Sequence, residues 1–423
     1  MEHDRPVTRA WVLHPDLKSD QHRRDAVPAL AEAVALAAAM PELDVVGSTS
    51  VRLPRIHPGM LFGKGKIEEL KQVFKANEVE LVLIDGPVTP VQQRNLEKEW
   101  GVKLLDRTGL ILEIFSDRAR TAEGVLQVEM AALSYQRTRL VRAWTHLERQ
   151  RGGLGFVGGP GETQIEADRR AIDDQLNRLR KQLAKVVKTR ALHRASRAKV
   201  PFPIVALVGY TNAGKSTLFN RLTGADVFAK DMLFATLDPT MRKIELPSGD
   251  EIIMSDTVGF ISDLPTELVA AFRATLEEVL DADLIVHVRD ISHAQTEEQA
   301  KDVEAILTAL GVAEDAPVIE VWNKVDLLDE EGAEAVRRQS ERRDDLYAIS
   351  AVTGEGMDLL LDAVSEKVKD PRSTEVLDLS FAMGRERAWL FDAGVVTDDV
   401  QTDDGYQLTV FWTDLQKARY SQL

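Results

Sequence analysis

The chain contains no cysteine among its 423 residues. This absence excludes disulfide bonds, thiolate nucleophiles and zinc sites with cysteine ligands, and it is typical of a reducing compartment. The chain also lacks a long apolar run: the apolar stretch 29–40 is too short to span a bilayer and contains Glu32. The first ten residues show no signal-like hydrophobic segment. We therefore expect a cytoplasmic protein that does not insert into a membrane.

The length and composition are those of an ordinary multidomain globular chain. A chain of 423 residues should form about three domains, and its 44% hydrophobic content is sufficient for their cores. The formal net charge of −16 argues against general attraction to nucleic acid, so any polyanion site has to be a local patch. We expect a monomer.

One stretch, residues 204–220, reads IVALVGYTNAGKSTLFN. Its apolar start predicts a buried strand, and Gly-Lys-Ser-Thr predicts a helix that begins after a glycine turn. This is the pattern of a P-loop, in which backbone N–H groups surround phosphates, Lys215 reaches the β- and γ-phosphates and Ser216 binds Mg²⁺. A strand-turn-helix corner without a ligand is the alternative. The predicted nucleotide-binding residues here are Gly209, Tyr210, Thr211, Asn212, Ala213, Gly214, Lys215 and Ser216.

Two further motifs follow in the order that a phosphate-hydrolysing switch requires. Asp256-Thr257-Val258-Gly259 ends an apolar run, so that Asp256 can hold Mg²⁺ through water and the Gly259 N–H lies near a γ-phosphate. Between this motif and the P-loop lies Phe234-Ala235-Thr236-Leu237-Asp238, whose Thr236 hydroxyl is the natural second protein ligand of Mg²⁺. We therefore expect these residues to bind nucleotide, with Ser216 and Thr236 as metal ligands.

The last two motifs predict the choice of base. Asn323-Lys324-Val325-Asp326 ends a strand-like run, and its carboxylate can accept two N–H bonds from guanine, whereas adenine offers no such pair of donors. Ser350-Ala351-Val352 would close over the base. Each short motif alone could be a turn or a helix start. The P-loop and the motifs that begin at residues 256, 323 and 350 are four in order, each after its own strand, and they indicate a P-loop GTPase specific for guanine.

We assign no catalytic side chain. The residue after Gly259 is Phe260, where many GTPases place the glutamine that orients the attacking water, and phenylalanine cannot orient water. The sequence therefore predicts slow hydrolysis of GTP by the chain alone and stimulation by a partner.

The pattern of strands and helices predicts an α/β multidomain fold. Residues 1–115 alternate short β-rich runs with helical patterns and form an N-terminal α/β domain with a parallel sheet; the loop at 62–66 is either a plain turn or a second nucleotide site. Residues 116–200 form a basic helical hairpin. Residues 201–371 form the P-loop domain with a doubly wound sheet, and residues 372–423 form a small C-terminal α/β domain.

The predicted hairpin has a charge unlike that of the rest of the chain. It carries 18 Lys and Arg against 9 Asp and Glu, and nine of the basic residues lie in 178–199. Six glycines within 152–161 exceed what an antiparallel turn requires. A basic helical face is often only solvated, but the long glycine-rich tip favours insertion into a shaped partner such as RNA.

The chain resembles the HflX family of ribosome-associated GTPases over essentially its full length. The resemblance rests on GYTNAGKSTLFN from Gly209, LFATLDPT from Leu233, DTVGFI from Asp256 and PGETQ from Pro160. It implies binding to the large (50S) ribosomal subunit and its rRNA, a hairpin tip that reaches the peptidyl-transferase region, and splitting of stalled or stressed ribosomes. The chain departs from the family pattern in two places. Members usually carry an arginine just before Gly-Pro-Gly, whereas this tip reads Phe156-Val157-Gly158-Gly159-Pro160 and is slightly longer, and Val352 stands where many GTPases have lysine.

Three other functions stay open at this point. One is a GTPase of large-subunit assembly, which would leave immature particles when deleted. Another is a regulatory switch that binds a membrane or protease partner without RNA, which the basic hairpin disfavours. The last is a P-loop kinase, which is disfavoured by Asn323-Lys324-Val325-Asp326 and by the lack of an evident domain for an acceptor substrate.

Overall fold

The computed structural model describes most of the chain and divides it into two compact units, Met1–Leu361 and Asp362–Leu423. The described residues are 7–18, 24–150, 160–197, 202–225, 233–234, 240–262, 279–280, 282–313, 315–368, 372–402, 404–413, 416–417 and 420–421.

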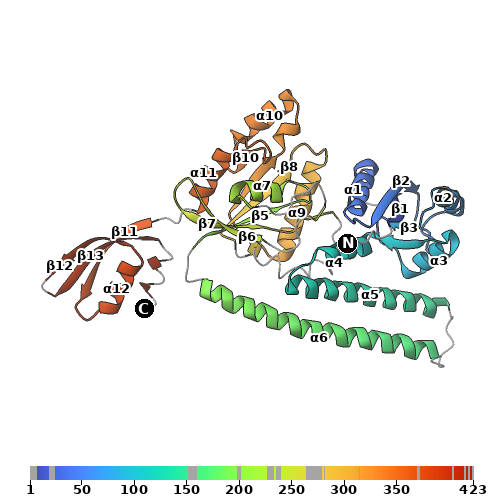
Figure 1. Ribbon diagram of the computed structural model, residues 1–423, viewed down its shortest axis with the longest axis horizontal. Coiled ribbons are helices and arrows are strands. Elements are labelled where there is room, and N and C mark those ends of the chain that lie inside the picture. The colour runs from blue at the N-terminus through green and yellow to red at the C-terminus, as the bar shows by residue number, and fades with distance from the viewer. Residues whose placement is uncertain are drawn as a thin grey trace, which may run out of the picture. The chain divides into compact units, whose positions relative to one another are not determined.

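The N-terminal sheet has four parallel strands in the order β2-β1-β3-β4 (Figure 1). Its strands and helices are β1 (Thr8–Leu17), α1 (Ala26–Ala38), β2 (Leu43–Leu53), α2 (Lys64–Ala76), β3 (Leu81–Ile84), α3 (Pro90–Trp100) and β4 (Lys103–Asp106). The prediction of a parallel α/β sheet is confirmed. Strand β2 was not predicted, because Gly47 and the following Ser48, Thr49 and Ser50 interrupt the apolar pattern. Its long parallel pairing with β1 stabilises it as a strand, although its composition is not that of a typical strand.

A run of three helices follows: α4 (Arg107–Arg118), α5 (Ala122–Gln150) and α6 (Pro160–Arg197). Helices α5 and α6 lie side by side (Figure 1) and are joined by an Arg137–Asp173 ion pair of 2.8 Å. Apolar residues in both helices recur at the i, i+3, i+4 spacing that predicts a packed seam between them. Val128, Leu176 and Leu179 are buried accordingly, but the prediction is wrong for Val125, which is 47% exposed. The glycine-rich tip lies almost wholly outside the described residues, which resume at Pro160.

The P-loop domain contains a sheet in the order β10-β9-β8-β5-β7-β6. All neighbouring strands are parallel except β6 and β7, which are antiparallel. Its elements are β5 (Ile204–Gly209), α7 (Lys215–Thr223), β6 (Thr240–Glu245), β7 (Glu251–Asp256), β8 (Leu284–Asp290), α9 (Thr296–Leu310), β9 (Val318–Asn323), the 3₁₀ turn η1 (Val325–Leu327), α10 (Glu330–Ser340), β10 (Leu346–Ala348) and α11 (Met357–Val368). Strands β5 and β8 are almost entirely buried, as their unbroken apolar runs predict.

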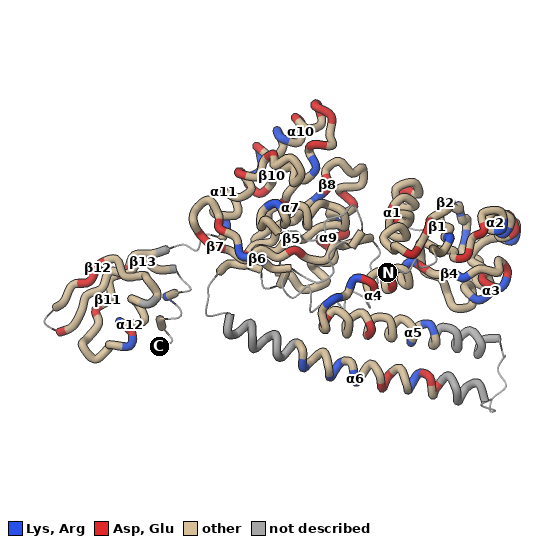
Figure 2. The backbone as a smooth tube through the Cα atoms, viewed as in Figure 1, with Lys and Arg blue, Asp and Glu red and all other residues tan. Residues whose placement is uncertain are grey.

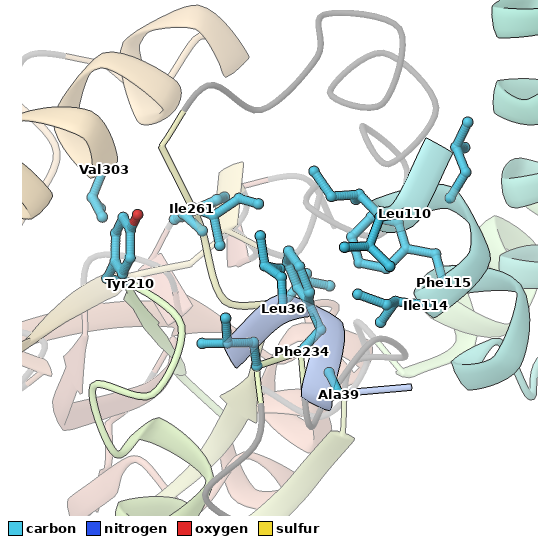
Figure 3. Packing of buried hydrophobic residues seen from close by; sticks show 14 of the residues in the cluster. Leu36, Ala39, Leu110, Ile114, Phe115, Tyr210, Phe234, Ile261 and Val303 are labelled. Carbon is cyan, nitrogen blue, oxygen red and sulfur yellow. The ribbon is translucent and has the colours of Figure 1, made fainter. Parts of the chain in front are cut away.

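An apolar cluster joins the N-terminal helices to the P-loop domain within the first unit. Figure 3 shows Leu36 of α1 and Leu110, Ile114 and Phe115 of α4 close to Phe234. The rings of Phe115 and Phe234 meet edge to face with centroids 4.6 Å apart. Helix α4 was not predicted because it is apolar on most sides, with seven buried residues and no clear amphipathic period. Because α4 is buried, it forms part of the core that the N-terminal domain and the P-loop domain share.

In the residues that the structure describes, the second unit contains the end of α11, a three-stranded antiparallel sheet in the order β11-β13-β12, and α12. Its elements are β11 (Arg372–Ser380), α12 (Gly384–Asp392), β12 (Val396–Gln401) and β13 (Gly405–Thr413). Leu390, Leu408 and Trp412 form its core. The expected small α/β domain is present, while the domain boundaries given above stay predictions. Among the helices that the described residues form, none is long and apolar enough to cross a membrane.

Candidate nucleotide site

Four of the predicted motifs follow the carboxyl ends of parallel strands in one sheet. Gly209 ends β5, Asp256 ends β7, Asn323 ends β9, and Ser350 follows β10. Because ligands of doubly wound sheets bind at this edge, the fold places all four motifs where one nucleotide could contact them. Hydrogen bonds between the motifs then fix their arrangement.

The P-loop curls around the ammonium group of its own lysine. Lys215 is 6% exposed, and its Nζ donates to the carbonyls of Gly209 at 3.1 Å and Tyr210 at 2.7 Å. Burial lowers the pKa of Lys215 to about 8, although the charge of Asp256 acts to raise it. Gly214 caps α7 with φ of 94°, and a Cβ there would lie 2.2 Å from Asn323 Nδ2. Only glycine fits this turn, which directs the first N–H groups of α7 into the loop.

Ser216 and Asp256 bring a hydroxyl and a carboxylate together beside the P-loop. The Ser216 Oγ donates to Asp256 Oδ2 at 2.7 Å, and Asp256 is fully buried. A hydroxyl and a carboxylate at this distance are the hard donors that Mg²⁺ prefers, so the residues present fit the expected ion. The other predicted ligand, Thr236, lies outside the described residues together with Ala235, Leu237 and Asp238.

The segment after Asp256 packs directly on the P-loop. Thr257 donates its hydroxyl to the Leu207 carbonyl at 2.6 Å, and Val258 is buried. A Cβ on Gly259 would lie 2.8 Å from Thr211 Cγ2 and 3.0 Å from Lys215 Nζ. A side chain at residue 259 would therefore force the two segments apart, which explains the glycine.

Phe260 is held against the P-loop by its backbone and not by its ring. Its carbonyl accepts from the Thr211 N–H at 2.7 Å, and its own N–H donates to the Gly209 carbonyl at 3.1 Å. The ring is 1% exposed and belongs to the apolar cluster. That Phe260 orients no water stays a prediction.

The base end of the site is tied to the phosphate end by Asn323. Its Nδ2 donates to the Ala213 carbonyl at 2.8 Å, and its Oδ1 accepts from the Ala351 N–H at 2.9 Å. Lys324 adopts φ of 69° and pairs with Asp290 at 2.8 Å. The left-handed turn at Lys324 precedes η1, in which the neighbouring Val325 is buried and Asp326 is exposed.

The closing loop is anchored at its first residue. Ser350 is fully buried, and its Oγ accepts from the Thr353 N–H at 3.0 Å. Ala351 is buried, whereas Val352 is 69% exposed. In the P-loop itself, Thr211 and Ala213 are buried and Asn212 is exposed with φ of 60°.

The side chain of Tyr210 points away from the other motifs, toward the N-terminal domain. Its hydroxyl donates to Glu32 of α1, bonds to Ser262 Oγ at 2.8 Å and accepts from the Ser262 N–H at 2.8 Å. Arg107 completes the contact, with Nη2 at 2.5 Å from Glu32 Oε1 and 2.9 Å from the Ser262 carbonyl. Burial and the charge of Glu32 raise the pKa of Tyr210 well above its usual range.

Arg107 forms a second ion pair, with Asp85. Its Nη1 lies 2.6 Å from Asp85 Oδ1, and His14 bonds the other Asp85 oxygen at 2.7 Å. Although burial acts to raise it, the hydrogen bond with His14 and the charges of Arg107 and Arg24 hold the pKa of Asp85 at about 2. Sequence reasoning missed this network. One sequence feature could have indicated the network: residue 210 is aromatic, although the P-loop needs only backbone donors to bind phosphate.

Phe234 is likewise buried against Phe115, so only its backbone could approach a nucleotide. Its predicted role in binding stays a prediction.

The strand-turn-helix at 204–220, the Ser216–Asp256 pair and the Asn323 bridge together define a P-loop GTPase. Family models agree along the chain: residues 28–116 match "GTP-binding GTPase N-terminal", 118–197 "GTP-binding GTPase Middle Region", 204–324 "50S ribosome-binding GTPase" and 335–420 "HflX C-terminal domain". The chain belongs to the HflX family of GTPases and is a GTP hydrolase.

Curated relatives support this membership. GTPase HflX of Magnetococcus marinus is 46% identical over 400 residues, which cover 95% of this chain and 91% of that protein. GTPase HflX of Escherichia coli is 44% identical over 349 residues, with 82% of this chain and 81% of that protein covered. Among solved structures, a GTP-binding protein from Sulfolobus solfataricus in complex with GDP is 23% identical with a TM-score of 0.46, covering 85% of this chain and 98% of that chain.

Proposed function

We propose that this GTPase binds the large (50S) ribosomal subunit and splits or rescues stalled or stressed ribosomes. The observation that carries the proposal is the basic α5–α6 hairpin in an otherwise acidic chain, next to a domain that matches a 50S ribosome-binding GTPase model. In the part of α6 that Figure 2 colours, Asp and Glu lie toward the N-terminal end, whereas Lys and Arg occur along its length. Such a local basic surface suits the rRNA backbone, and the proposal implies a cytoplasmic protein that works as a monomer.

In this proposal the P-loop N–H groups and Lys215 bind the phosphates, and Ser216 with Thr236 would hold Mg²⁺, while Asp256 would contact it through water. Mg²⁺ supplies positive charge that neutralises the β- and γ-phosphate oxygens when it is bound. The Gly259 N–H would sense the γ-phosphate. Asp326 and the loop 350–352 would recognise guanine, with Asn323 joining the two ends of the site.

Hydrolysis would then act as the switch. GTP would order the loop around Thr236 and the segment after Gly259, and loss of the γ-phosphate would release both. Because Phe260 is buried and carries no polar group, the chain alone should hydrolyse GTP slowly. The ribosome would supply or position the group that orients water.

A base-switch experiment tests the site and the function together. Asparagine at 326 accepts poorly from guanine N1 and N2 but can donate to the second carbonyl of xanthine. We expect the wild-type chain to split 70S ribosomes with GTP, and Asp326→Asn to split them with xanthosine triphosphate and poorly with GTP. Light scattering of 70S particles with excess protein measures splitting.

The outcomes separate the two parts of the proposal. An unchanged preference for GTP in Asp326→Asn would contradict the guanine site. A wild-type chain that binds GTP and 50S subunits but leaves 70S particles intact would contradict the splitting function alone. Glu330→Gln, at an exposed carboxylate of the neighbouring α10, is the matched control and should keep the wild-type preference.

A further inference from the structure

Helix α7 carries phosphate-binding residues in its first turn and a single arginine in its last. The guanidinium of Arg221 donates to three successive carbonyls of the closing loop: Nη1 to Ala351 at 3.4 Å and to Val352 at 2.9 Å, and Nη2 to Thr353 at 3.0 Å. Three acceptors in one turn match the planar fork of arginine, which a lysine ammonium cannot reproduce.

The loop is shaped to receive this side chain. Gly354 adopts φ of 94°, and a Cβ there would lie 2.0 Å from Arg221 Nη2. A residue with a side chain would therefore displace the guanidinium. Arg221 of α7 and Gly354 of the loop therefore have complementary shapes where the two segments meet.

Carbonyls that are held in place also fix N–H groups. A peptide unit is planar, so a bond to the Ala351 carbonyl orients the Val352 N–H on the opposite side of the same plane. The Thr353 and Gly354 N–H groups are already bonded to the side chain and the carbonyl of Ser350. Asn323 holds the start of the loop through the Ala351 N–H, and Arg221 holds its other side.

We propose that Arg221 is a positioning residue for guanine recognition: it fixes the backbone of residues 351–353 so that the loop can donate to the O6 carbonyl of the base. The inference rests on the proposed guanine site. It gives α7 two roles, phosphate binding at its start and base-loop positioning at its end. This loop has Val352 in place of the lysine found in many GTPases, and Arg221 supplies a cation from the neighbouring helix.

The proposal predicts which nucleotides respond. GDP and IDP both carry an O6 carbonyl, whereas ADP carries an amino group at that position. Loss of Arg221 should weaken GDP and IDP equally and leave ADP unchanged, so the preference for GDP over ADP falls while the ratio of GDP to IDP stays constant. We expect Arg221→Met to release fluorescently labelled GDP on the order of 10-fold faster.

A matched control lies beside the same loop. Arg337 of α10 pairs with the Glu355 side chain at 2.5 Å and touches none of the three carbonyls. Arg337→Met removes the same charge and should release GDP at the wild-type rate. Arg221→Lys keeps the charge without the fork and should still release GDP faster than the wild-type chain; if Arg221→Met does not fold, this variant alone tests the proposal.

Stopped-flow release of labelled GDP, with competition by IDP and ADP, gives all the required values. Wild-type rates in Arg221→Met or Arg221→Lys would overturn the proposal, as would equal acceleration in Arg337→Met. An unequal loss of GDP and IDP would also overturn it, since the effect would not pass through O6. Failure of the guanine site itself is distinguishable, because Asp326→Asn would then leave the preference of the parent chain unchanged.

Discussion

His287 shows how one buried residue can set the response of this GTPase to acid. It lies on β8 in the middle of the sheet and is 6% exposed. Burial lowers its pKa to about 4; the charge of Glu320 acts against this, and those of Arg289 and Lys215 add to it. Within the described part of the chain its Nε2 has no hydrogen-bond partner. The native state therefore keeps this imidazole neutral at physiological pH.

Acid should destabilise the native chain through this residue. As the pH falls through 6.5 the unfolded chain takes up a proton at His287, whereas the native chain does so only near pH 4, so the free energy of unfolding decreases across that window. The residue contributes a loss of about 2 kcal/mol between roughly pH 7.5 and pH 5. Urea unfolding of His287→Gln at both pH values should show a smaller decrease by about that amount.

His57→Gln is the control, since His57 is exposed in the N-terminal domain. Equal pH dependence in the wild type and in His287→Gln would show that the imidazole is not held neutral by burial.

At the scale of elements, the P-loop is fastened to the N-terminal domain by Tyr210. The contact joins the end of β5 to α1 through Glu32, to the first residue of α4 through Arg107, and to the segment after Gly259 through Ser262. Ser262 passes the connection on to Asp302 of α9 at 2.6 Å. These contacts connect five segments that are far apart in the sequence, and the Tyr210 hydroxyl bonds directly to Glu32 and Ser262.

Tyr210→Phe should weaken the fold more than the nucleotide site. Removing the hydroxyl deprives the buried Ser262 N–H of its acceptor and the half-buried Glu32 of one of its donors, which costs about 1–3 kcal/mol. The affinity for GDP should change little, because the P-loop binds phosphates through its backbone. Urea unfolding and GDP titration of the same protein measure the two effects.

Tyr347→Phe provides the comparison, since the Tyr347 hydroxyl donates only to the exposed Asp344 carbonyl at 2.8 Å. If Tyr210→Phe lost GDP affinity without losing stability, the Tyr210 side chain would belong to the nucleotide site after all.

The sequence predicted those elements whose pattern is local. Apolar runs located β5, β8 and β9, and the motif residues at their ends meet as expected because parallel strands align their carboxyl ends. Helix α4 and strand β2 could not be predicted, because each is stabilised by partners distant in the sequence. The contacts of Tyr210 and Arg221 depend on the same long-range packing, which composition and spacing do not encode.

At the scale of the whole molecule, a basic hairpin belongs to an acidic chain. Attraction of the hairpin to RNA by charge can therefore be tested separately from recognition of the RNA by shape. We expect that replacing residues 152–161 with a short tight turn keeps nucleotide binding, since the P-loop domain has its own sheet. Salt-sensitive attraction to rRNA should also persist, because counterion release depends on charge and the basic residues of 178–199 remain. Splitting of 70S particles should fall far more than ribosome binding does.

Pelleting at two salt concentrations measures binding, and light scattering measures splitting. Full splitting by the tip-replaced chain would mean that the glycine-rich loop is only a connector. Replacing Lys185 and Arg180 by glutamine is the converse variant and should reduce binding at low salt.

The hydroxyl of Tyr210 also limits how this gene can recombine. A crossover that joined the P-loop domain to a foreign N-terminal domain would have to deliver a carboxylate at position 32 and a guanidinium at position 107, or else remove the acceptor of the Tyr210 hydroxyl and the donor to the Ser262 carbonyl. It would also have to match the ring of Phe115 to that of Phe234. We therefore expect few chimaeras joined between these domains to fold, and we expect the two domains to be inherited together.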